Sequence, residues 1–592
     1  MVQGSSTAPK QAGFRQVMSV VHTWSTLVPI WVLYFVFITG SVGYFHIEVT
    51  SWMEPEIEHV SEPIDEVRML EHAQDYLSEN AGDATQWVIN FPSERKDTAR
   101  LSWSRELSPE ETEGLSRDER RALQAENRGA VTLNPVTGAI YGDEVRATGG
   151  GSLLYRMHYV LHYMPRALGE YIVIISTFLM FAGLITGIII HKKIFADFFT
   201  FRPGKGQRSW LDTHNIFSVM TLPFQIMITF SGLLFYVATV MPLVLYGPAV
   251  TLGFDVENIM TAESSDDFSD KNKELIAIIQ EDVFGDTPIE PASGVEAEML
   301  PLTQVHADYR SRLPDHAIFN LIVQNVNDET STATVRAHWG INRQDRPIDR
   351  YSAVTGDLLA DSSERQSKSA ASDVQGVFLG LHEGRFSPIV LRWLYFLTGL
   401  AGAVMIASGA ILWTSKRRQA HEAEARRFAK RGLDPEAAGA PRLGKGVTFV
   451  EHMNVATIIG LPIGIAAYFI ANRVIAVGIE DRGALEADAL FVVWALTLVY
   501  AIIRPRTHIW TELLWLACAS YAAIPLVNAF TTDRHLGSSL IEGDWIMAGF
   551  DLTMFAIAAA FALAARRAAA KDRAVQKEAK AYPQTSTLAP AE

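Results

Sequence analysis

The chain has 592 residues, of which 48% are hydrophobic, and a formal net charge of −15 at pH 7. A positive mean hydropathy and long apolar runs indicate a membrane protein and exclude an ordinary soluble enzyme. Nucleic-acid binding is disfavoured as well, because the basic residues gather at the ends of apolar runs, where membrane topology accounts for them.

Eight apolar stretches approach the roughly 20 residues that a helix needs to cross a bilayer. The first follows Lys10 and Arg15 and resembles a signal peptide, but it is longer than an h-region and no A-x-A site follows it. We therefore expect an uncleaved first helix. Lys and Arg cluster at every second connection, which predicts that both termini are cytoplasmic.

These patterns predict a polytopic α-helical membrane protein with about eight transmembrane helices and two large extracytoplasmic α+β domains. In chain order the predicted segments are a cytoplasmic N-terminus (1–15), helix 1 (16–45), extracytoplasmic domain 1 (46–157), helix 2 (158–192), a cytoplasmic loop (193–209), helix 3 (210–245), extracytoplasmic domain 2 (246–380), helix 4 (381–415), a charged cytoplasmic connector (416–447), a C-terminal four-helix membrane region (448–565) and a disordered cytoplasmic tail (566–592).

Local patterns supply detail within the two polar domains. Ser108 and Glu111 form a capping-box pattern that predicts a helix through about residue 124. Alternating segments at 86–91, 333–339 and 350–354 predict strands. In the C-terminal region, Cys518 is the one cysteine of the chain, so no disulfide, iron–sulfur cluster or thiolate-zinc site can be built within it.

The first 415 residues contain an internal duplication. Histidine and glycine are 18 residues apart in helices 1 and 3 (22 to 40 and 214 to 232), and Thr-Gly or Ser-Gly ends helices 2 and 4. A Val-Thr-Gly marker precedes each even helix, at 136–138 and 354–356. Each repeat is helix, soluble domain, helix, so the two copies have the same membrane orientation. Equivalent residues near the symmetry axis can then face each other.

This symmetry makes the matched histidines candidate haem ligands. His22 can oppose His214 towards the cytoplasm, and His162 can oppose His382 towards the outside. A histidine at such depth can instead be held by a hydrogen bond to a neighbouring helix. His158 lies one turn before His162 and can replace it as ligand, and His191 can compete with the inner pair.

Several common cofactor motifs are absent from the sequence. It has no G-x-G-x-x-G after a strand, no P-loop and no H-E-x-x-H. Without a flavin or nicotinamide domain, an electron donor would have to be another protein or a diffusing reductant.

The sequence resembles the PepSY-associated transmembrane family over roughly residues 15–415. The resemblance is carried by the His22-x-Trp24 helix and by the segments LHYMPRALGEY (161–171), HKKIFADFFTFRPGK (191–205), WLDTHN (210–215) and LHEGRFSPIVLRWLYFLTGLAG (381–402). It implies PepSY-like periplasmic domains in a bacterial inner-membrane protein. It also implies two b haems on His22, His162, His214 and His382, an unidentified cytoplasmic electron donor, and a ferric siderophore or other iron chelate as substrate.

The leading hypothesis is therefore a transmembrane haem oxidoreductase that acts on a periplasmic ferric chelate. Two alternatives stay open. The protein could be a non-enzymatic scaffold whose PepSY-like domains bind peptides or regulate a partner, or a small-molecule transporter, since parallel repeats also occur in transporters. Bound haem separates the first hypothesis from the other two.

Overall fold

The computed structural model describes residues 13–191, 201–236, 291–361, 370–431 and 443–581, except residues 113, 143 and 505. They form two compact units. The membrane unit comprises residues 1–55, 146–229 and 393–592, and the sheet unit comprises residues 56–145 and 230–392. Within the described residues, six helices are long and apolar enough to cross a bilayer, or eight if each of two bent helix pairs is one span. The prediction of a polytopic membrane protein is confirmed.

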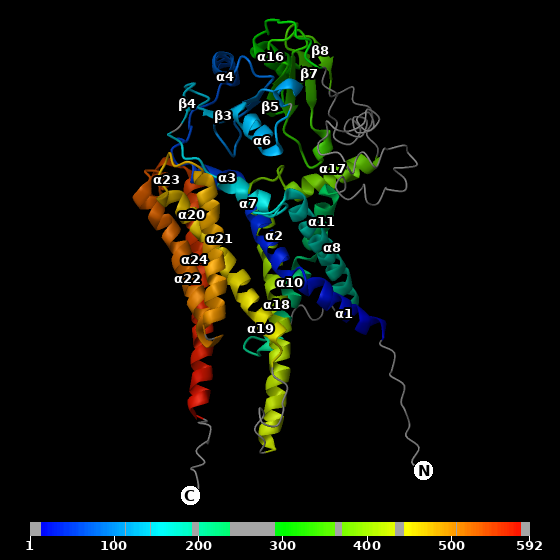
Figure 1. Ribbon diagram of the computed structural model, residues 1–592, viewed down its shortest axis with the longest axis vertical. Helices are drawn as coiled ribbons and strands as arrows, with labels where there is room; N and C mark the ends of the chain where they lie inside the picture. Colours follow the sequence, from blue (N-terminus) through cyan, green and yellow to red (C-terminus); the bar gives the residue numbers. More distant parts are fainter. Residues whose placement is uncertain are drawn as a thin grey trace. The chain divides into compact units, whose positions relative to one another are not determined.

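The helices of the first repeats have these bounds: α1 (Phe14–Leu27), α2 (Ile30–Gly43), α3 (His46–Met53), α7 (Gly150–Met157), α8 (Arg166–Ile190), α10 (Gln207–Met220), α11 (Leu222–Phe235), α17 (Ala370–Glu383) and α18 (Ile389–Lys430). The C-terminal region contributes α19 (Lys445–Val455), a π-helical turn η4 (Ala456–Gly460), α20 (Leu461–Val474), α21 (Arg482–Ile503), α22 (Arg506–Thr531), α23 (Leu536–Glu542) and α24 (Trp545–Ala581). In this region α22 and α24 run side by side (Figure 1).

Two predicted single helices are broken in the structure. Helix 1 is the pair α1 and α2, bent by 61°, and the described part of helix 3 is the pair α10 and α11, bent by 69°. Residues 237–245 of the predicted helix 3 lie outside the described residues. Pro29 immediately precedes α2 and Pro223 lies in the first turn of α11. Proline removes a backbone donor and disfavours a continuous helix on its N-terminal side, but it fits the start of a new one. Both second halves begin eight residues after the histidine (30 after 22, 222 after 214), so the bend belongs to the repeat.

Three predicted boundaries also change. Helices α3 and α7 belong to the membrane unit, because they pack on each other, α7 also packs on α2, and α3 also packs on α24. The sheet unit therefore holds only residues 56–145 of the first loop. Helix α18 continues through half of the predicted connector. Helix α24 continues to Ala581, where disorder was expected from 566, because its Ala, Lys, Arg and Glu residues are strong helix formers.

The described residues of the sheet unit form one antiparallel sheet of eight strands in the order β4-β3-β2-β1-β5-β6-β7-β8. The strands are β1 (Gln86–Asn90), β2 (Ala99–Ser104), β3 (Arg128–Leu133), β4 (Ile140–Tyr141), β5 (Ile318–Gln324), β6 (Thr332–Ala337), β7 (Ile348–Ser352) and β8 (Leu358–Ala360). Each loop contributes four consecutive strands. The halves join where β1 pairs with β5, with Val88 opposite Ile322 at the centre of the register. The two predicted domains therefore share one sheet.

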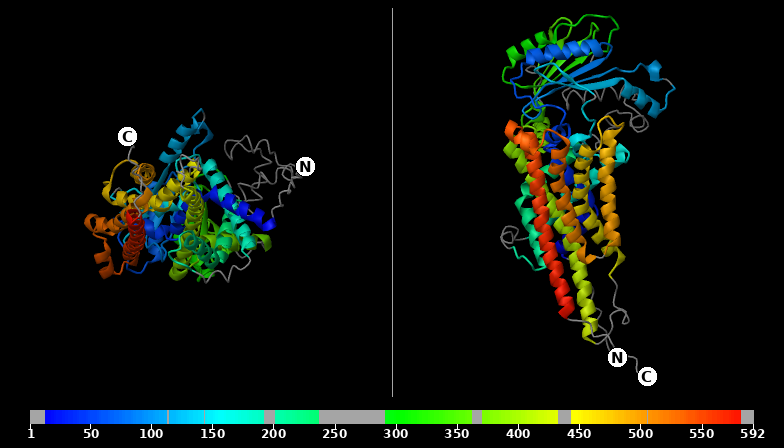
Figure 2. Two further views of the ribbon diagram at one scale, coloured as in Figure 1. Left: turned by 90° about the horizontal axis from the view of Figure 1, so that it is seen from below. Right: turned by 90° about the vertical axis from the view of Figure 1, so that its left-hand side faces the viewer.

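One helix from each half covers the same face of this sheet. Helices α4 (Glu66–Asn80) and α16 (Leu302–Arg312) lie side by side across it (Figure 2). Their buried residues, such as Leu70 and Tyr309, share one hydrophobic cluster with Trp87 and Val335 of the strands. The α+β prediction for the two loops is confirmed at this level.

Turns and short helices complete the sheet unit. The Thr-Gly markers are turns of equivalent hairpins, with φ of 73° at Gly138 and 80° at Gly356, a region that favours glycine. The capping box at Ser108 and Glu111 forms, but the expected helix is split into α5 (Pro109–Thr112) and α6 (Arg117–Glu126). Gly114 has φ of 74° between them, which ends the first helix. A three-residue 3₁₀ turn, η3 (Arg343–Asp345), lies before β7.

Candidate functional site

The structure brings the inner pair of predicted histidines together. His22 lies on α1 and His214 on α10, each eight residues before the helix that follows the bend. The centroids of the two imidazole rings are 6.4 Å apart, and the rings are inclined by 69°. Both side chains are partly exposed rather than sealed in the core. Two residues that are 192 positions apart in the chain thus share one place in the membrane unit.

Each imidazole is oriented by a backbone carbonyl of the even helix of its own repeat. The Nδ1 atom of His22 lies 2.9 Å from the carbonyl oxygen of Gly183 on α8, and Nδ1 of His214 lies 2.9 Å from that of Met405 on α18. A carbonyl oxygen only accepts, so Nδ1 carries the proton in both neutral rings. The Nε2 lone pair is then the one available to a metal, which is the usual second-sphere arrangement of a ligating histidine.

The Thr-Gly and Ser-Gly motifs explain how the rings fit against these helices. The hydroxyl of Thr186 lies 2.8 Å from the Ala182 carbonyl and 3.0 Å from the Gly183 carbonyl, between which its donated proton is shared, and the hydroxyl of Ser408 donates to the Met405 carbonyl at 2.9 Å. The glycines that follow leave room for the rings. A Cβ atom would lie 3.4 Å from His22 Cε1 at position 187 and 3.3 Å from His214 Cε1 at position 409. Both halves of the motif therefore serve the histidine of the same repeat.

The pair suits a haem iron better than a bare metal ion. If each imidazole bound one shared metal through a bond of about 2 Å, the two ring centroids could lie roughly 6 Å apart, close to the observed 6.4 Å. Within the described residues, no group of three or more His, Cys, Asp or Glu side chains could hold a metal ion. A haem supplies its own four equatorial nitrogens, so two protein ligands are sufficient.

The competitor His191 lies at the end of α8, where its N–H donates to the Gly187 carbonyl at 3.2 Å. It is close enough to both rings of the pair to interact with them electrostatically. No described hydrogen bond directs its ring towards either of them.

The outer histidines have different surroundings. His158 caps the C-terminus of α7, with Nδ1 bonded to the Tyr155 carbonyl, and its ring lies 3.6 Å from where a Cβ of Gly40 would be. His162 instead stacks on Phe491 of α21, with ring centroids 5.5 Å apart and planes inclined by 12°. Burial lowers the pKa of both rings, and nearby Arg156 adds to this effect at His162, which favours neutral imidazole.

In the sheet unit, His382 lies on α17 and bonds through Nδ1 to the Ser231 hydroxyl at 2.8 Å. Ser231-Gly232 is the counterpart of Thr39-Gly40 in the duplication. His158 is therefore the residue whose contact with the first repeat matches that of His382 with the second. His162 does not make the equivalent contact.

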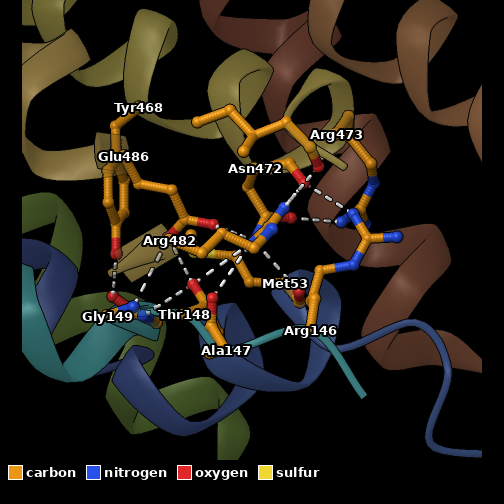
Figure 3. Close-up of polar contacts among 12 residues, drawn as sticks. Met53, Arg146, Ala147, Thr148, Gly149, Tyr468, Asn472, Arg473, Arg482 and Glu486 are labelled. Carbon is orange, nitrogen blue, oxygen red and sulfur yellow. Dashed lines mark hydrogen bonds and ion pairs between the residues drawn. The ribbon is translucent and has the colours of Figure 1, made fainter. Parts of the chain in front are cut away.

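The sequence analysis missed a buried polar network in the membrane unit (Figure 3). Three of its charged members, Arg473, Arg482 and Glu486, are at most 5% exposed. They lie at the end of α20 and the start of α21, where apolar helices rarely carry ionisable groups without a reason. That placement was the available signal, and the sequence analysis did not use it.

A comparison with sequence models of protein families finds a match to the PepSY-associated TM region over residues 19–416. The matched region contains all six candidate histidines and ends before α19. No curated protein matches the chain significantly.

Proposed function

The chain belongs to the family of the PepSY-associated TM region, and on that premise we propose that it is a haem-dependent transmembrane oxidoreductase. It passes electrons from the cytoplasmic side of a bacterial inner membrane to a ferric chelate, such as a siderophore, on the periplasmic side. The observation that carries the proposal is the inner pair, His22 and His214, with both Nδ1 atoms held by carbonyls and the rings 6.4 Å apart.

The residues around the pair prepare both imidazoles to hold a haem. The carbonyls of Gly183 and Met405 fix the tautomer and aim each Nε2. Gly187 and Gly409 let each ring lie close against its supporting helix. A haem held by His22 and His214 would supply one-electron transfer. The pair thereby serves electron transfer rather than binding of a substrate to the iron.

The direction of transfer follows from the charges at the helix ends. Arg202 and Lys205 precede α10, Arg208 lies in its first turn, and a basic run follows the apolar part of α18. By the positive-inside rule this favours a cytoplasmic location for these helix ends and for both termini. The acidic loops then face the periplasm. Hard oxygen donors hold Fe(II) more weakly than Fe(III), so reduction there would release the metal from its chelate.

The duplication also predicts a second haem, with one ligand from the outer end of each repeat. We assign His382 to the second repeat and His158 to the first. Two observations support His158 over His162. It contacts Gly40, and it lies eight residues before α8, as His382 lies seven residues before α18, whereas His162 lies four residues before α8.

The proposal is tested by the optical spectrum of detergent-purified protein, oxidised and dithionite-reduced, with haem quantified per chain. We expect low-spin b-type bands and about two haems per chain. His22→Ala and His214→Ala should each remove the same haem. His508→Ala is the matched control, because that histidine lies on α22 beside Asp572, outside the family match.

Substrate reduction is tested separately. Addition of a ferric siderophore to the reduced protein should restore the oxidised spectrum, and Fe(II) should be trapped by a ferrous chelator. A haem protein that is not reoxidised would be a haem sensor rather than a reductase. A colourless protein from haem-replete cells would refute the redox function and favour the scaffold hypothesis.

A further inference from the structure

The network of Figure 3 links the C-terminal helices to the short segment that leads into α7. Glu486 on α21 is fully buried and accepts hydrogen bonds from the Thr148 hydroxyl at 2.5 Å and from the Gly149 N–H at 3.4 Å. Its other oxygen accepts from Asn472 at 2.8 Å and from Arg482. One carboxylate thus joins α20, α21 and residues 148–149, and all these groups belong to the membrane unit.

Two guanidinium groups reinforce the same junction. Arg482 donates to the Ala147 carbonyl at 3.0 Å and to the carbonyls of Asn472 and Ile475 at the end of α20. Arg146 donates to the Asn472 carbonyl at 2.6 Å. Positive charge at a helix C-terminus is stabilised by the helix dipole and by the free carbonyls there. The C-terminus of α20 therefore offsets the cost of burying these two arginines.

The tethered segment sets the start of α7. Thr148 also accepts from the Gly150 N–H at 3.1 Å, and the Tyr468 hydroxyl on α20 donates to the Gly150 carbonyl at 2.9 Å. Gly150 has φ of 56°, which orients the turn into the helix. Helix α7 then runs against α2 and α3 and ends at His158. The network therefore fixes the N-terminal end of the helix that carries this histidine.

Helix α21 also holds the residues just after α7. His162 stacks on Phe491, and the Tyr163 hydroxyl bonds to the Asp488 carboxylate. Glu486, Asp488 and Phe491 lie within two turns of one helix, outside the region that matches the family. The segment 148–163 is thus bound to α21 on both sides of α7.

We propose that α21 positions His158 by clamping both ends of α7, with Glu486 and Asp488 as positioning residues. This gives the C-terminal helices a role in the outer haem site, and it rests on the proposed haem function. The histidines of the inner pair lie on α1 and α10, which the network does not touch. The inner haem is therefore an internal reference within the same molecule.

The test uses full-length protein with Glu486→Gln, which keeps the size of the side chain but removes its charge, and the double variant Glu486→Gln/Asp488→Asn. The control is Glu512→Gln, which removes a carboxylate on α22 that pairs with Arg504 away from α7. Hydrogen exchange of residues 151–157, followed by mass spectrometry, reports on α7 without reference to haem. Low-spin EPR signals and midpoint potentials report on each haem, and His158→Ala identifies the outer one.

We expect exchange in α7 to be about tenfold faster in the double variant. The EPR signal that His158→Ala abolishes should shift or disappear, while the signal of the inner haem and all signals of the control stay unchanged. Unchanged exchange in α7 would overturn the clamp. Faster exchange with unchanged EPR and potentials would overturn the positioning role. If the protein holds no haem, the proposed function fails, and the exchange result alone decides whether α21 holds α7.

Discussion

Removal of either Arg482 or Glu486 alone should lower the free energy of unfolding far more than half the loss caused by removing both. Both side chains are 0% exposed, so neither charge can turn to water when the other is removed. Breaking a buried pair by removal of one partner costs about 3–5 kcal/mol, because the remaining charge stays buried and uncompensated. We expect Glu486→Met and Arg482→Met each to lower the free energy of unfolding by this amount.

The double variant should lose much less than the sum. With both charges gone, the residual cost comes from buried groups that lose a hydrogen-bond partner, at about 1–3 kcal/mol for each group left without one. These groups are the carbonyls of Ala147 and Ile475, which lose Arg482, and the Gly149 N–H, which loses Glu486. These variants form a double-mutant cycle. The free energy of unfolding of the original protein, the two single variants and the double variant is measured on purified full-length protein in mixed detergent micelles. The exposed pair of Arg504 and Glu512 is the control and should show a coupling of about 0–1 kcal/mol. Additivity of the buried pair within about 0.5 kcal/mol would refute the reasoning.

Three further predictions follow from other parts of the molecule. Gly187→Val and Gly409→Val should each remove most of the inner haem, because even a Cβ would lie 3.4 or 3.3 Å from the imidazoles. The measurement is the amount of haem per chain. The control Gly549→Val should retain both haems, because a Cβ there meets nothing within 4 Å. In the sheet unit, burial opposes ionisation of Glu66, but hydrogen bonds from His306 and Arg310 outweigh it and lower the pKa from 4.5 to about 2. The ionised carboxylate therefore stabilises the fold above pH 4.5, by about 1–2 kcal/mol after allowance for its partial exposure, and this is lost as the pH falls towards 2. Acid unfolding of Glu66→Gln should lack this component, and an identical pH profile would contradict the assignment. Trp87→Ala should destabilise the sheet unit by about 3–5 kcal/mol in denaturant unfolding followed by near-UV circular dichroism, since Trp87 is fully buried and donates to the Ala81 carbonyl; a loss below 1 kcal/mol would mean that the core collapses around the gap.

The duplication allowed much of the fold to be predicted. Hydropathy located the membrane helices, and the inner pair His22 and His214 proved to be neighbours because a repeat places equivalent residues at equivalent positions. The bends at 28–29 and 221 were missed, since a long apolar run with proline near its centre reads as one span in a hydropathy window. The proline itself was the overlooked signal.

The union of the two loops in one sheet could not be predicted from periodicity. Alternation identifies strands but not their partners, and the pairing of β1 with β5 joins segments from different loops. The role of Glu486 was hidden for a related reason. Its partners Thr148 and Asn472 come from distant parts of the chain, so no local pattern reveals that its charge is compensated.

The shared sheet imposes an order on biosynthesis. β5 begins 228 residues after β1 ends (318 minus 90), so the ribosome needs roughly 10–50 s to supply it at about 5–20 residues per second. Throughout that interval the outer edge of β1 lacks its partner strand, and an unpaired edge can recruit strands from other chains. The first loop must therefore wait for the second, and chaperones that cover strand edges would have their largest effect on this protein before β5 has been synthesised.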